Sequence, residues 1–486
     1  MSGPDPRAGK ESIGGAHGAG TPESPYPHLA WLFGLQRFGM RTGLDTAREL
    51  LRRLGNPESE LDTVLVGGTN GKGSVARLLA ACLQASGVRT GLFTSPHLQR
   101  VGERARVNGV PASDADMDRL VGAVRSEATA VEATFFEVMT AVCLLRFVEA
   151  RADVAVLEVG MGGRLDATNV AAPDLTVITG VALDHTAVLG DTVQAIAAEK
   201  AGIVRPGVPL LTGAEGAALR VLEDRAAAVE APVFVLGREL NVAVIASSWE
   251  GLELRLTWNA SQVRHVPLVL QEAGAMQLTA PLVGRHQAGN VALAAFGALL
   301  LGVEPGTVQA ALALTRWPGR LERREYEGRH VVLDGAHNQQ AAAALARALG
   351  ELEGRVAVLV LGVSADKDVD ALLSELQGVA SHVIFTAAVN SPRSAEPTAL
   401  LEAWQRASGA AAVNAEALSA EAVSAEAVSA KPASAEAVTG PAAALRRALT
   451  LAAPGETVAV AGSLFLVAEV CNVLDGVDGE PYERWQ

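Results

Sequence analysis

A lysine within a glycine-rich turn carries the most specific chemistry in this sequence. The segment Gly67–Ser74 reads GGTNGKGS, follows an apolar run and precedes a helical pattern. Glycines let backbone N–H groups approach phosphate oxygens, and the start of a helix adds the positive end of its dipole. Lys72 can neutralise terminal phosphates, although Gly73 stands where Ser or Thr usually follows the lysine. The segment predicts a triphosphate site, with a Gly-rich turn and an incidental lysine as the alternative.

Candidate metal ligands follow other apolar runs. Ser95 lies in LFTSPHL and offers a hydroxyl oxygen suited to magnesium, though the motif alone is also an ordinary turn. Glu158 ends a buried run, where a carboxylate is costly unless it meets a cation. His185 follows Asp184 at a further strand end and is a plausible metal ligand or a loop histidine without function. Lys200 has apolar neighbours on a helix, where a lysine at the surface is the simpler interpretation.

The remaining polar candidates lie in two groups. Asp166, in LEVGMGGRLDATN, can accept hydrogen bonds from a polar heterocycle, or can serve a structural Asp/Gly turn. The second group lies in the C-terminal part of the chain and could bind nucleotide and a small amino acid across a cleft between domains. Its members are Arg320, Asp334, His337, Lys367 and Ser463.

Alternating strand and helix signals predict the elements that position these residues. Apolar runs that end at a glycine or a charged residue recur, and strands alternating with helices indicate a parallel sheet with helices on both faces. Ligands of such sheets bind beyond the carboxyl ends of the strands, where the polar residues above are found. The runs are TVLVGG, DVAVLEVG (Asp153–Gly160), LTVITG (Leu175–Gly180) and VPLLTG (Val208–Gly213).

The fold class predicted is therefore α/β with two domains. Residues 26–315 form a phosphate-loop ATPase-type parallel-sheet domain, with a small antiparallel excursion at about 232–283. RWPGRLERRE (Arg316–Glu325) is predicted to be an interdomain hinge, and 319–486 a smaller Rossmann-like domain. Residues 1–25 have the composition of a disordered tail, and the five-residue near-repeats within 410–438 predict a flexible insertion.

Composition excludes several classes of partner. The chain has 486 residues, 49% of them hydrophobic, and a formal net charge of −14. An acidic surface argues against nucleic acid or anionic membrane as the main partner. Three cysteines without a C-x-x-C pair predict buried thiols in a reducing compartment. No signal peptide or membrane span is predicted, so we expect a cytoplasmic protein.

The ordered motifs of the chain resemble the folylpolyglutamate synthase / dihydrofolate synthase family. They extend from about Tyr26 to Val470, apart from the repeat insertion, and several are more specific to the folate enzymes than to the related Mur ligases. In chain order they are FGMRTGL, GTNGKGS, TSPHL, RVNG, TFFEV, LEVGMGGRLDATN, DHTAVLG, AAEKAGI, GRHQAGN, WPGRLE, LDGAHN and GSLF.

The resemblance implies a Mur-ligase-type ATP-binding domain over 26–315, a glutamate-ligase domain over 319–486, and a role for each matching residue. The nucleotide contacts would be Asn70, Gly71, Lys72, Gly73, Ser74, Asn290, Arg320 and Asp334. The metal ligands would be Ser95, Glu158, His185 and Lys200, the last as a carbamate. Lys72, Lys200, His185 and Arg320 would be catalytic. The pterin-side residues would be Phe135, Phe136, Glu137, Leu165, Asp166 and Ala167, with His337 and Ser463 near glutamate.

The implied activity is ligation of L-glutamate to dihydropteroate, reduced folates or both, with ATP and one or two Mg²⁺ ions. A carboxylate is a poor acyl donor, so ATP would first convert it to an acyl phosphate that the glutamate amine attacks. The family also implies a monomer with small-molecule partners. This activity requires that the side chains of Lys72, Ser95, Glu158 and His185 lie together in one pocket facing Arg320.

Two other interpretations compete. A Mur-type ligase of cell-wall synthesis generally carries a uridine-nucleotide domain before the phosphate loop, whereas only 71 residues precede Lys72 here, and it usually has Thr in place of Gly73. A non-catalytic nucleotide-binding module would not need Glu158, His185 and Lys200 at three separate strand or helix ends. ATP turnover that depends on both a pteroyl compound and glutamate would separate the three.

Overall fold

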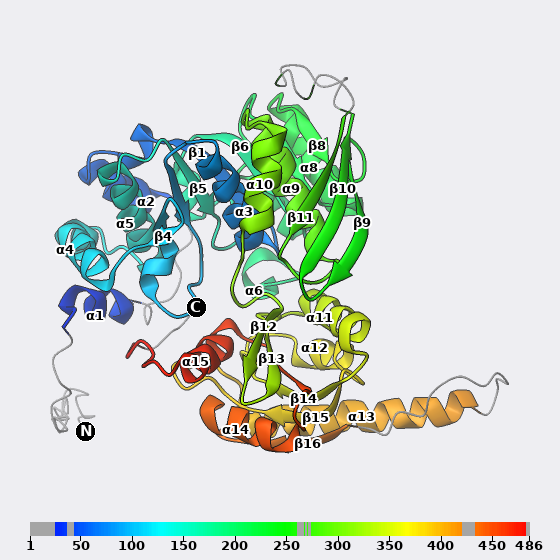
Figure 1. Cartoon of the computed structure of the whole chain (residues 1–486). Helices are drawn as coiled ribbons and strands as arrows, with labels where there is room; N and C mark the ends of the chain where they lie inside the picture. The colour runs from blue at the N-terminus through cyan, green and yellow to red at the C-terminus, as the bar shows by residue number, and fades with distance from the viewer. Residues whose placement is uncertain are drawn as a thin grey trace, which may run out of the picture.

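The computed structural model describes residues 25–35, 43–259, 267, 270, 274–419 and 433–482. They form a larger domain and a smaller one, joined by the segment 315–321 (Figure 1). The tail expected over 1–25 lies almost entirely outside the described residues. Within these ranges no helix is both long and apolar enough to cross a bilayer.

An eight-stranded sheet forms the centre of the larger domain. Its order is β4-β3-β2-β5-β1-β6-β7-β8; the pairs from β2 through β8 are parallel, while β3 and β4 are antiparallel additions. The strands are β1 Asp62–Gly67, β2 Thr90–Phe93, β3 Ala105–Val107, β4 Val110–Pro111, β5 Val154–Glu158, β6 Pro173–Ile178, β7 Leu210–Thr212 and β8 Val233–Val235.

Helices cover both faces of this sheet, as the alternation of strand and helix signals predicted. Leu65 and Leu157 pack in a core with α5, whereas Val64 and Val156 face a second core with α3 and α9. The helices are α1 Pro27–Gly34, α2 Asp45–Arg53, α3 Lys72–Ala85, α4 Asp114–Ala130, α5 Phe135–Glu149, α6 Thr186–Leu189, α7 Val193–Ala201, α8 Gly216–Ala228, α9 Gln287–Leu300 and α10 Pro305–Leu314, with the 3₁₀ turns η2 Pro57–Glu60, η3 Val101–Arg104 and η4 Ala167–Val170.

The antiparallel excursion is present, within narrower bounds than expected. Strands β9 Leu240–Ser248, β10 Gly251–Trp258 and β11 Gly274–Ala280 form a three-stranded antiparallel sheet beside α9 and α10 (Figure 1). Alternate residues of β10 such as Leu252, Leu254 and Leu256 are buried, which is the period of a half-exposed strand. Residues 233–235, predicted to belong to this excursion, instead form β8 of the large sheet.

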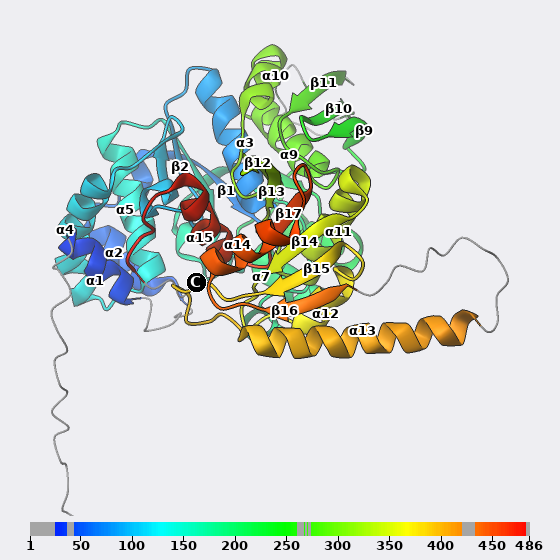
Figure 2. The same cartoon turned by 60° about the horizontal axis from the view of Figure 1, so that its bottom comes forward.

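The smaller domain is a six-stranded sheet between two layers of helices (Figure 2). Its order is β12-β13-β17-β14-β15-β16, parallel except for the β12–β13 pair. The elements are β12 Glu322–Tyr326, β13 Arg329–Leu333, α11 Gln339–Glu353, β14 Val356–Leu361, α12 Val369–Glu375, β15 Ala380–Phe385, α13 Pro397–Ser419, β16 Ser434–Ala437, α14 Pro441–Leu451, β17 Thr457–Ala461 and α15 Leu464–Asp475.

Two predictions about this domain need correction. Part of the segment 410–438, predicted to be a flexible insertion, is regular: α13 continues to Ser419, and β16 pairs with β15. The Ala-, Glu- and Leu-rich sequence favours helix, and an edge strand pairs through its backbone whatever its side chains. Residues 420–432 lie outside the described part. The predicted hinge is also shorter, because β12 already begins at Glu322.

Candidate active site

The glycine-rich turn connects β1 to α3, so the predicted phosphate loop has the required strand-turn-helix form. Gly71 has φ +84°, and a Cβ there would lie 2.3 Å from Asn290 Oδ1, so only glycine fits. A Cβ on Gly73 would lie 3.3 Å from Glu158 Oε2 and 3.4 Å from the Trp317 ring. The glycine in place of the usual Ser or Thr therefore leaves room beside a carboxylate.

The Glu158 carboxylate ends β5 and is 5% exposed. Its Oε2 accepts a hydrogen bond of 2.8 Å from the backbone N–H of Ser95, in the loop after β2. Burial raises the pKa of Glu158, while the charge of Lys72 works in the opposite direction. Among the residues the structure describes, no basic side chain forms an ion pair with this carboxylate. A buried carboxylate without an ion-pair partner beside a serine loop suits a divalent cation.

Two lysines lie on the backbone of the phosphate loop. Lys72 Nζ donates to the carbonyls of Gly68 (3.3 Å) and Thr69 (3.1 Å). Lys200, on α7 and 4% exposed, donates to the Gly68 carbonyl at 2.7 Å. Burial, and next the charge of Lys72, lower the pKa of Lys200 to about 7. At neutral pH a large fraction of the Lys200 amine is therefore uncharged and nucleophilic.

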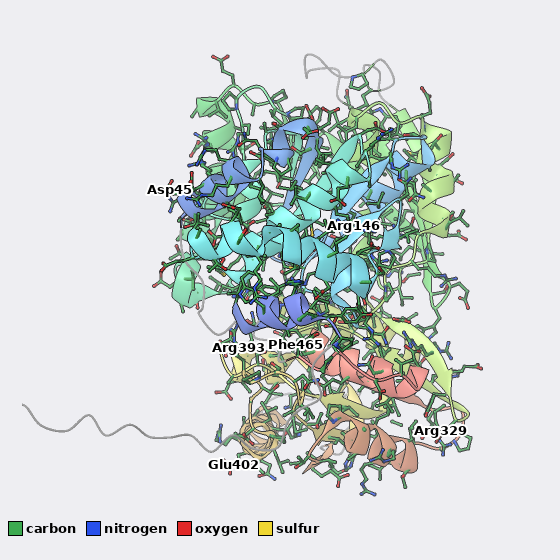
Figure 3. The ribbon with its side chains drawn as sticks, turned by 90° about the vertical axis from the view of Figure 1, so that its left-hand side faces the viewer. Asp45, Arg146, Arg329, Arg393, Glu402 and Phe465 are labelled. Atoms are coloured by element: carbon green, nitrogen blue, oxygen red, sulfur yellow. The ribbon has the colours of Figure 1, made fainter. Side chains whose placement is uncertain are left out.

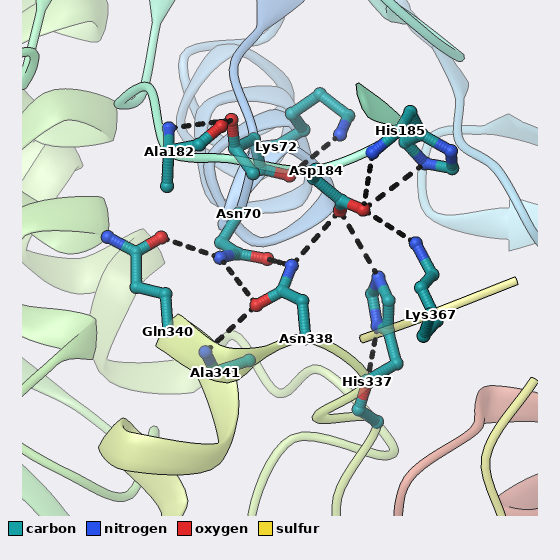
Figure 4. Close-up of polar contacts among 12 residues, drawn as sticks. Asn70, Lys72, Ala182, Asp184, His185, His337, Asn338, Gln340, Ala341 and Lys367 are labelled. Carbon is teal, nitrogen blue, oxygen red and sulfur yellow. Dashed lines mark hydrogen bonds and ion pairs between the residues drawn. The ribbon is translucent and has the colours of Figure 1, made fainter. Parts of the chain in front are cut away.

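Asp184, after β6, is the centre of a polar cluster that joins the two domains (Figure 4). Lys367 Nζ lies 2.6 Å from Asp184 Oδ1, and Asn338 Nδ2 donates to Oδ2 at 3.0 Å. His337 Nε2 lies 3.9 Å from the same carboxylate. Burial opposes the charge on Asp184, but His185 and Lys367 outweigh it and lower the pKa of the carboxyl. Lys367, Asn338 and His337 all come from the smaller domain.

The phosphate loop itself contacts the smaller domain. Asn70 Nδ2 donates to Gln340 Oε1 at 2.7 Å and to Asn338 Oδ1 at 3.3 Å, and Asn338 Nδ2 donates back to Asn70 Oδ1 at 3.0 Å (Figure 4). Asn338 also caps α11 by accepting from Ala341 N. The start of a helix in one domain is thus fixed to the nucleotide loop of the other.

Two histidines flank this cluster. His185 has φ +49° and precedes α6; its side chain is 37% exposed, and partial burial, and next the charge of Lys367, lower its pKa to about 4. At physiological pH the imidazole is therefore neutral and keeps a lone pair for a metal. His337 Nδ1 lies 2.8 Å from the Gly335 carbonyl and must donate to it, and burial lowers the pKa of His337.

Arg320 and Asp334 lie where the linker enters the smaller domain. Asp334 follows β13 and is 7% exposed; its Oδ2 accepts from Leu321 N at 2.9 Å and its Oδ1 from Ala336 N at 2.8 Å. Arg320 Nη1 donates to the Gly319 carbonyl at 3.0 Å. The charge of Arg320 is among those that favour ionised Glu158, so it acts on the site from across the domain boundary.

The six residues predicted on the pterin side lie in two adjoining segments. Phe136 and Asp166 meet at Gly160, where a Cβ would lie 2.5 Å from the Phe136 ring and 3.1 Å from Asp166 Oδ2. Asp166 accepts from Met161 N and Thr168 N and closes the loop after β5. Leu165 is half-buried and Ala167 is buried beside it.

Phe135 and Glu137 have structural partners within the larger domain. The Phe135 ring centroid lies 5.7 Å from that of Phe33 and 5.3 Å from the guanidinium carbon of Arg104. Glu137 Oε2 accepts from Thr134 N at 2.7 Å in a capping box that begins α5. Ser463 likewise caps α15, accepting from Phe465 N. These contacts explain the residues structurally and leave their predicted substrate roles as predictions.

Some of the predicted residues lie close together at the strand ends of the larger sheet. Ser95 and Glu158 are in contact, and the charge of Lys72 acts on Glu158, His185 and Lys200. Within the described ranges no three His, Cys, Asp or Glu side chains cluster as a metal site, so a cation here would need the serine hydroxyl or a modified lysine as well.

Asp184 and Asn338 had no role predicted from the sequence, and Lys367 had only a general one. Each had a usable signal: Asp184 precedes a histidine at a strand end, Asn338 follows the LDGAH motif, and Lys367 stands between two aspartates. Their pairing joins residues 154 and 183 positions apart, which no local pattern reveals.

Comparison with protein-family models gives two matches that divide the chain as the structure does. Residues 66–299 match the Mur ligase middle domain, and residues 319–464 match the Mur ligase, glutamate ligase domain. Residues 300–318 separate the two matched regions, and Arg320 lies at the start of the second.

Comparison with individual proteins points to a narrower group within the Mur ligases. A dihydrofolate synthase/folylpolyglutamate synthase of Bacillus subtilis is 34% identical over 380 residues, covering 75% of this chain and 85% of the relative. A probable bifunctional folylpolyglutamate synthase/dihydropteroate synthase of Haloferax volcanii is 36% identical over 90% of this chain, which spans about half (49%) of that relative. A solved Mycobacterium tuberculosis folylpolyglutamate synthase complexed with ADP and AMPPCP superposes with TM-score 0.78 at 30% identity, covering 93% of this chain and 100% of that one.

Proposed function

The chain belongs to the dihydrofolate synthase/folylpolyglutamate synthase family of Mur ligases, and on that premise we propose that it ligates L-glutamate to a folate-type carboxylate at the expense of ATP. The observation that carries the proposal is the meeting of the phosphate loop, the buried Glu158 and the linker arginine at one domain boundary. The nucleotide complex of the Mycobacterium tuberculosis relative supports the choice of ATP.

In the proposed reaction a folate carboxylate attacks the γ-phosphorus of ATP, and ADP leaves. The resulting acyl phosphate is attacked by the amine of glutamate, and inorganic phosphate leaves as the amide forms. Phosphoryl transfer depends mainly on positioning and charge neutralisation. The backbone N–H groups of the turn 68–71 and the Lys72 ammonium would hold the phosphates, and Arg320 would approach from the linker. Contact between the domains through Asn70 and Asn338 would exclude water from the acyl phosphate.

Ser95, Glu158 and His185 would hold a magnesium ion. Their chemistry fits, because Glu158 is a buried carboxylate with one backbone hydrogen bond and His185 is neutral above a pKa of about 4. When bound, the cation would neutralise phosphate charge that Lys72 alone leaves uncompensated.

We further propose that Lys200 carries a carbamate and so can approach a second cation. A lysine whose pKa is lowered to about 7 by burial has the free amine that attack on CO₂ requires. The carbamate would turn a cation into an anion beside Lys72. Protein equilibrated with ¹³CO₂ should show a carbamate carbon in its NMR spectrum that Lys200→Met lacks, and identical spectra for the two would contradict this assignment.

The acceptor is proposed to be dihydropteroate as well as reduced folates, because the Bacillus subtilis relative is named for both activities. Phe136 and Asp166 would contact the pterin, and His337 and Ser463 the incoming glutamate. We propose a cytoplasmic monomer whose partners are these small molecules; the three free cysteines are buried, which suits a reducing compartment.

A product assay tests the proposal. Dihydropteroate and tetrahydrofolate are offered separately with ATP, Mg²⁺ and glutamate, and products are identified by mass spectrometry. Addition of one glutamate to each acceptor, with one ADP released per amide, is expected. Absence of a glutamylated product with either acceptor would overturn the proposed function, and a product from only one would restrict the acceptor.

A further inference from the structure

The last turn of α15 and the segment that follows it lie against the larger domain. We call these residues, Asn472–Tyr482, the strap. Gln99 Nε2 donates to Asn472 Oδ1 and to Asp475 Oδ2, both at 3.0 Å, and the Arg100 guanidinium donates to the Asp478 carbonyl at 3.0 Å. Figure 3 shows α15, whose first turn carries Phe465, where the two halves of the molecule meet.

Glu480 is the buried centre of the strap. Its side chain is only 3% exposed, although it belongs to a segment whose four preceding residues are exposed. Glu480 Oε2 lies 3.0 Å from His97 Nε2, and Glu480 Oε1 accepts from the backbone N–H of Val101. A buried carboxylate is retained only where such donors compensate its lost hydration. Both donors belong to the larger domain.

The direction of these hydrogen bonds is fixed by Arg104. Arg104 Nε donates to His97 Nδ1 at 2.7 Å, so Nδ1 carries the lone pair and Nε2 carries the hydrogen. His97 Nε2–H therefore donates to Glu480. Arg104 thus donates to His97, and His97 donates to Glu480, in a continuous chain of hydrogen bonds. The side chain of His97 and the residue Arg104 are each 1% exposed.

Two of these residues, His97 and Arg104, belong to the loop that carries Ser95. Thr94 N donates to the Arg104 carbonyl, and Glu103 accepts from the backbone N–H groups of three successive residues, 98–100. Ser95 N, one residue after Thr94, donates to Glu158. Residues 94–104 thus form one hydrogen-bonded loop, which contacts Glu158 through Ser95 and Glu480 through His97 and Val101.

A second contact extends the strap toward Phe135. Tyr482 stacks on Phe33 with ring centroids 4.5 Å apart and planes 12° apart, and Phe33 packs against Phe135. The strap therefore contacts the larger domain at two points, one polar and one aromatic.

We propose that Glu480 is a positioning residue: through Val101 and His97 it holds the loop 94–104, and with it Ser95, against Glu158 when the two domains are together. The inference rests on the proposed function for the role of Ser95 and Glu158. It gives the smaller domain a direct influence on the larger domain's cation site, separate from the Asp184–Lys367 contact at the phosphate loop.

Glu480→Gln tests the proposal with little change of shape. The Gln amide oxygen can accept from one donor, but its NH₂ then faces the other, so either Val101 N–H or His97 Nε2–H loses its acceptor. Asp478→Asn is the matched control, since it removes the same charge from an exposed side chain two residues away and keeps the backbone contact with Arg100.

Two readouts are measured on the full chain. Hydrogen exchange of the peptide 94–104, without substrates, should be about tenfold faster in Glu480→Gln and unchanged in Asp478→Asn. The Mg²⁺ concentration that gives half-maximal ligation should rise about tenfold in Glu480→Gln at an unchanged KM for glutamate, the usual scale for losing a group behind a metal ligand.

Wild-type exchange in the peptide 94–104 of Glu480→Gln, or a wild-type Mg²⁺ requirement, would overturn the proposal. Because exchange needs no substrate, it answers even if the wild-type chain fails as a folate ligase, so the two failures are distinguishable. Should Glu480→Gln not fold, Glu480→Asp keeps the charge but withdraws it by one methylene, and the same peptide must again exchange faster.

Discussion

Glu158 and Asp334 occupy equivalent places in the two sheets of this protein. Each carboxylate comes at the carboxyl end of a parallel strand, and each is less than a tenth exposed, at 5% and 7%. Their partners differ. Both oxygens of Asp334 accept backbone N–H groups, from Leu321 and Ala336, whereas the described residues give Glu158 a single one, from Ser95.

We infer from this difference that Asp334 stabilises the fold, whereas Glu158 is the carboxylate suited to bind a cation. Asp334 ties the linker to the end of β13 and so fixes the direction from which the adjoining Arg320 approaches. Burial destabilises the ionised form of Glu158 and so raises its pKa, and a bound cation would offset that cost. The larger domain therefore supplies the buried carboxylate without an ion-pair partner among the described residues, and the smaller domain fixes the position of Arg320.

The largest effect should come from removing the ammonium group of Lys72, whose charge acts on Glu158. Lys72→Ala is expected to lower the ligation rate by about 10³ or more, the scale of losing one charge-stabilising group in phosphoryl transfer. Steady-state kinetics with saturating substrates measures it, with Lys72→Arg as a control that keeps the charge. Near-normal turnover of the alanine variant would contradict a role of the phosphate loop in catalysis.

Glu158→Gln should cost about 100-fold in rate, since the loss of cation binding is worth about 3 kcal/mol. Its folding stability at neutral pH should be equal to that of the wild type or higher, because the Gln oxygen still accepts from Ser95 N and no buried charge remains. Activity assays and guanidinium titrations together give the answer. A variant both active and destabilised would reverse the roles of the two carboxylates.

Asp334→Asn should show the opposite pattern. The amide oxygen satisfies either Leu321 N–H or Ala336 N–H but not both, so the free energy of unfolding should fall by about 2 kcal/mol. Guanidinium titration of both variants side by side is the measurement. If Asp334→Asn is as stable as Glu158→Gln, the two strand ends do not differ as described.

A smaller effect is expected in the pH dependence of folding stability, to which Glu158 contributes. The folded-state pKa of Glu158 is raised above its ordinary 4.5, so between 4.5 and the raised value the folded protein binds more protons than the unfolded chain. Stability from this group is thus fully present below pH 4.5 and is lost as pH rises through the folded pKa. The stability of wild type relative to Glu158→Gln should decline over that window, and a relative stability that rises with pH would contradict the raised pKa.

Much of the fold could be predicted because the strands of the two parallel sheets end at recognisable motifs. The apolar runs around Val64, Leu157 and Val177 became the three adjacent strands β1, β5 and β6. The edge strands β12 and β16 were missed, because an edge strand needs only one partner and carries little apolar pattern. For β16, the repeat composition also concealed a pairing with β15, which lies about 50 residues earlier.

The site was predicted less completely than the fold. A carboxylate at a strand end predicts a ligand contact equally for Glu158 and Asp334, and only the backbone of Leu321 and Ala336 distinguishes them. The contacts of Asp184 with Lys367, and of Glu480 with His97, join residues 183 and 383 positions apart. Periodicity and motif spacing are local quantities, so they cannot report these pairs.

We propose that Ser95, Glu158 and His185 hold a cation against a triphosphate that Lys72 also binds. Crystals of the protein grown with Mn²⁺ and AMPPCP would test this arrangement most directly, through the anomalous signal of the metal. We expect the anomalous peak beside the Glu158 carboxylate, with the terminal phosphates at Lys72. A peak elsewhere, with Glu158 still bound only to Ser95 N, would contradict the account.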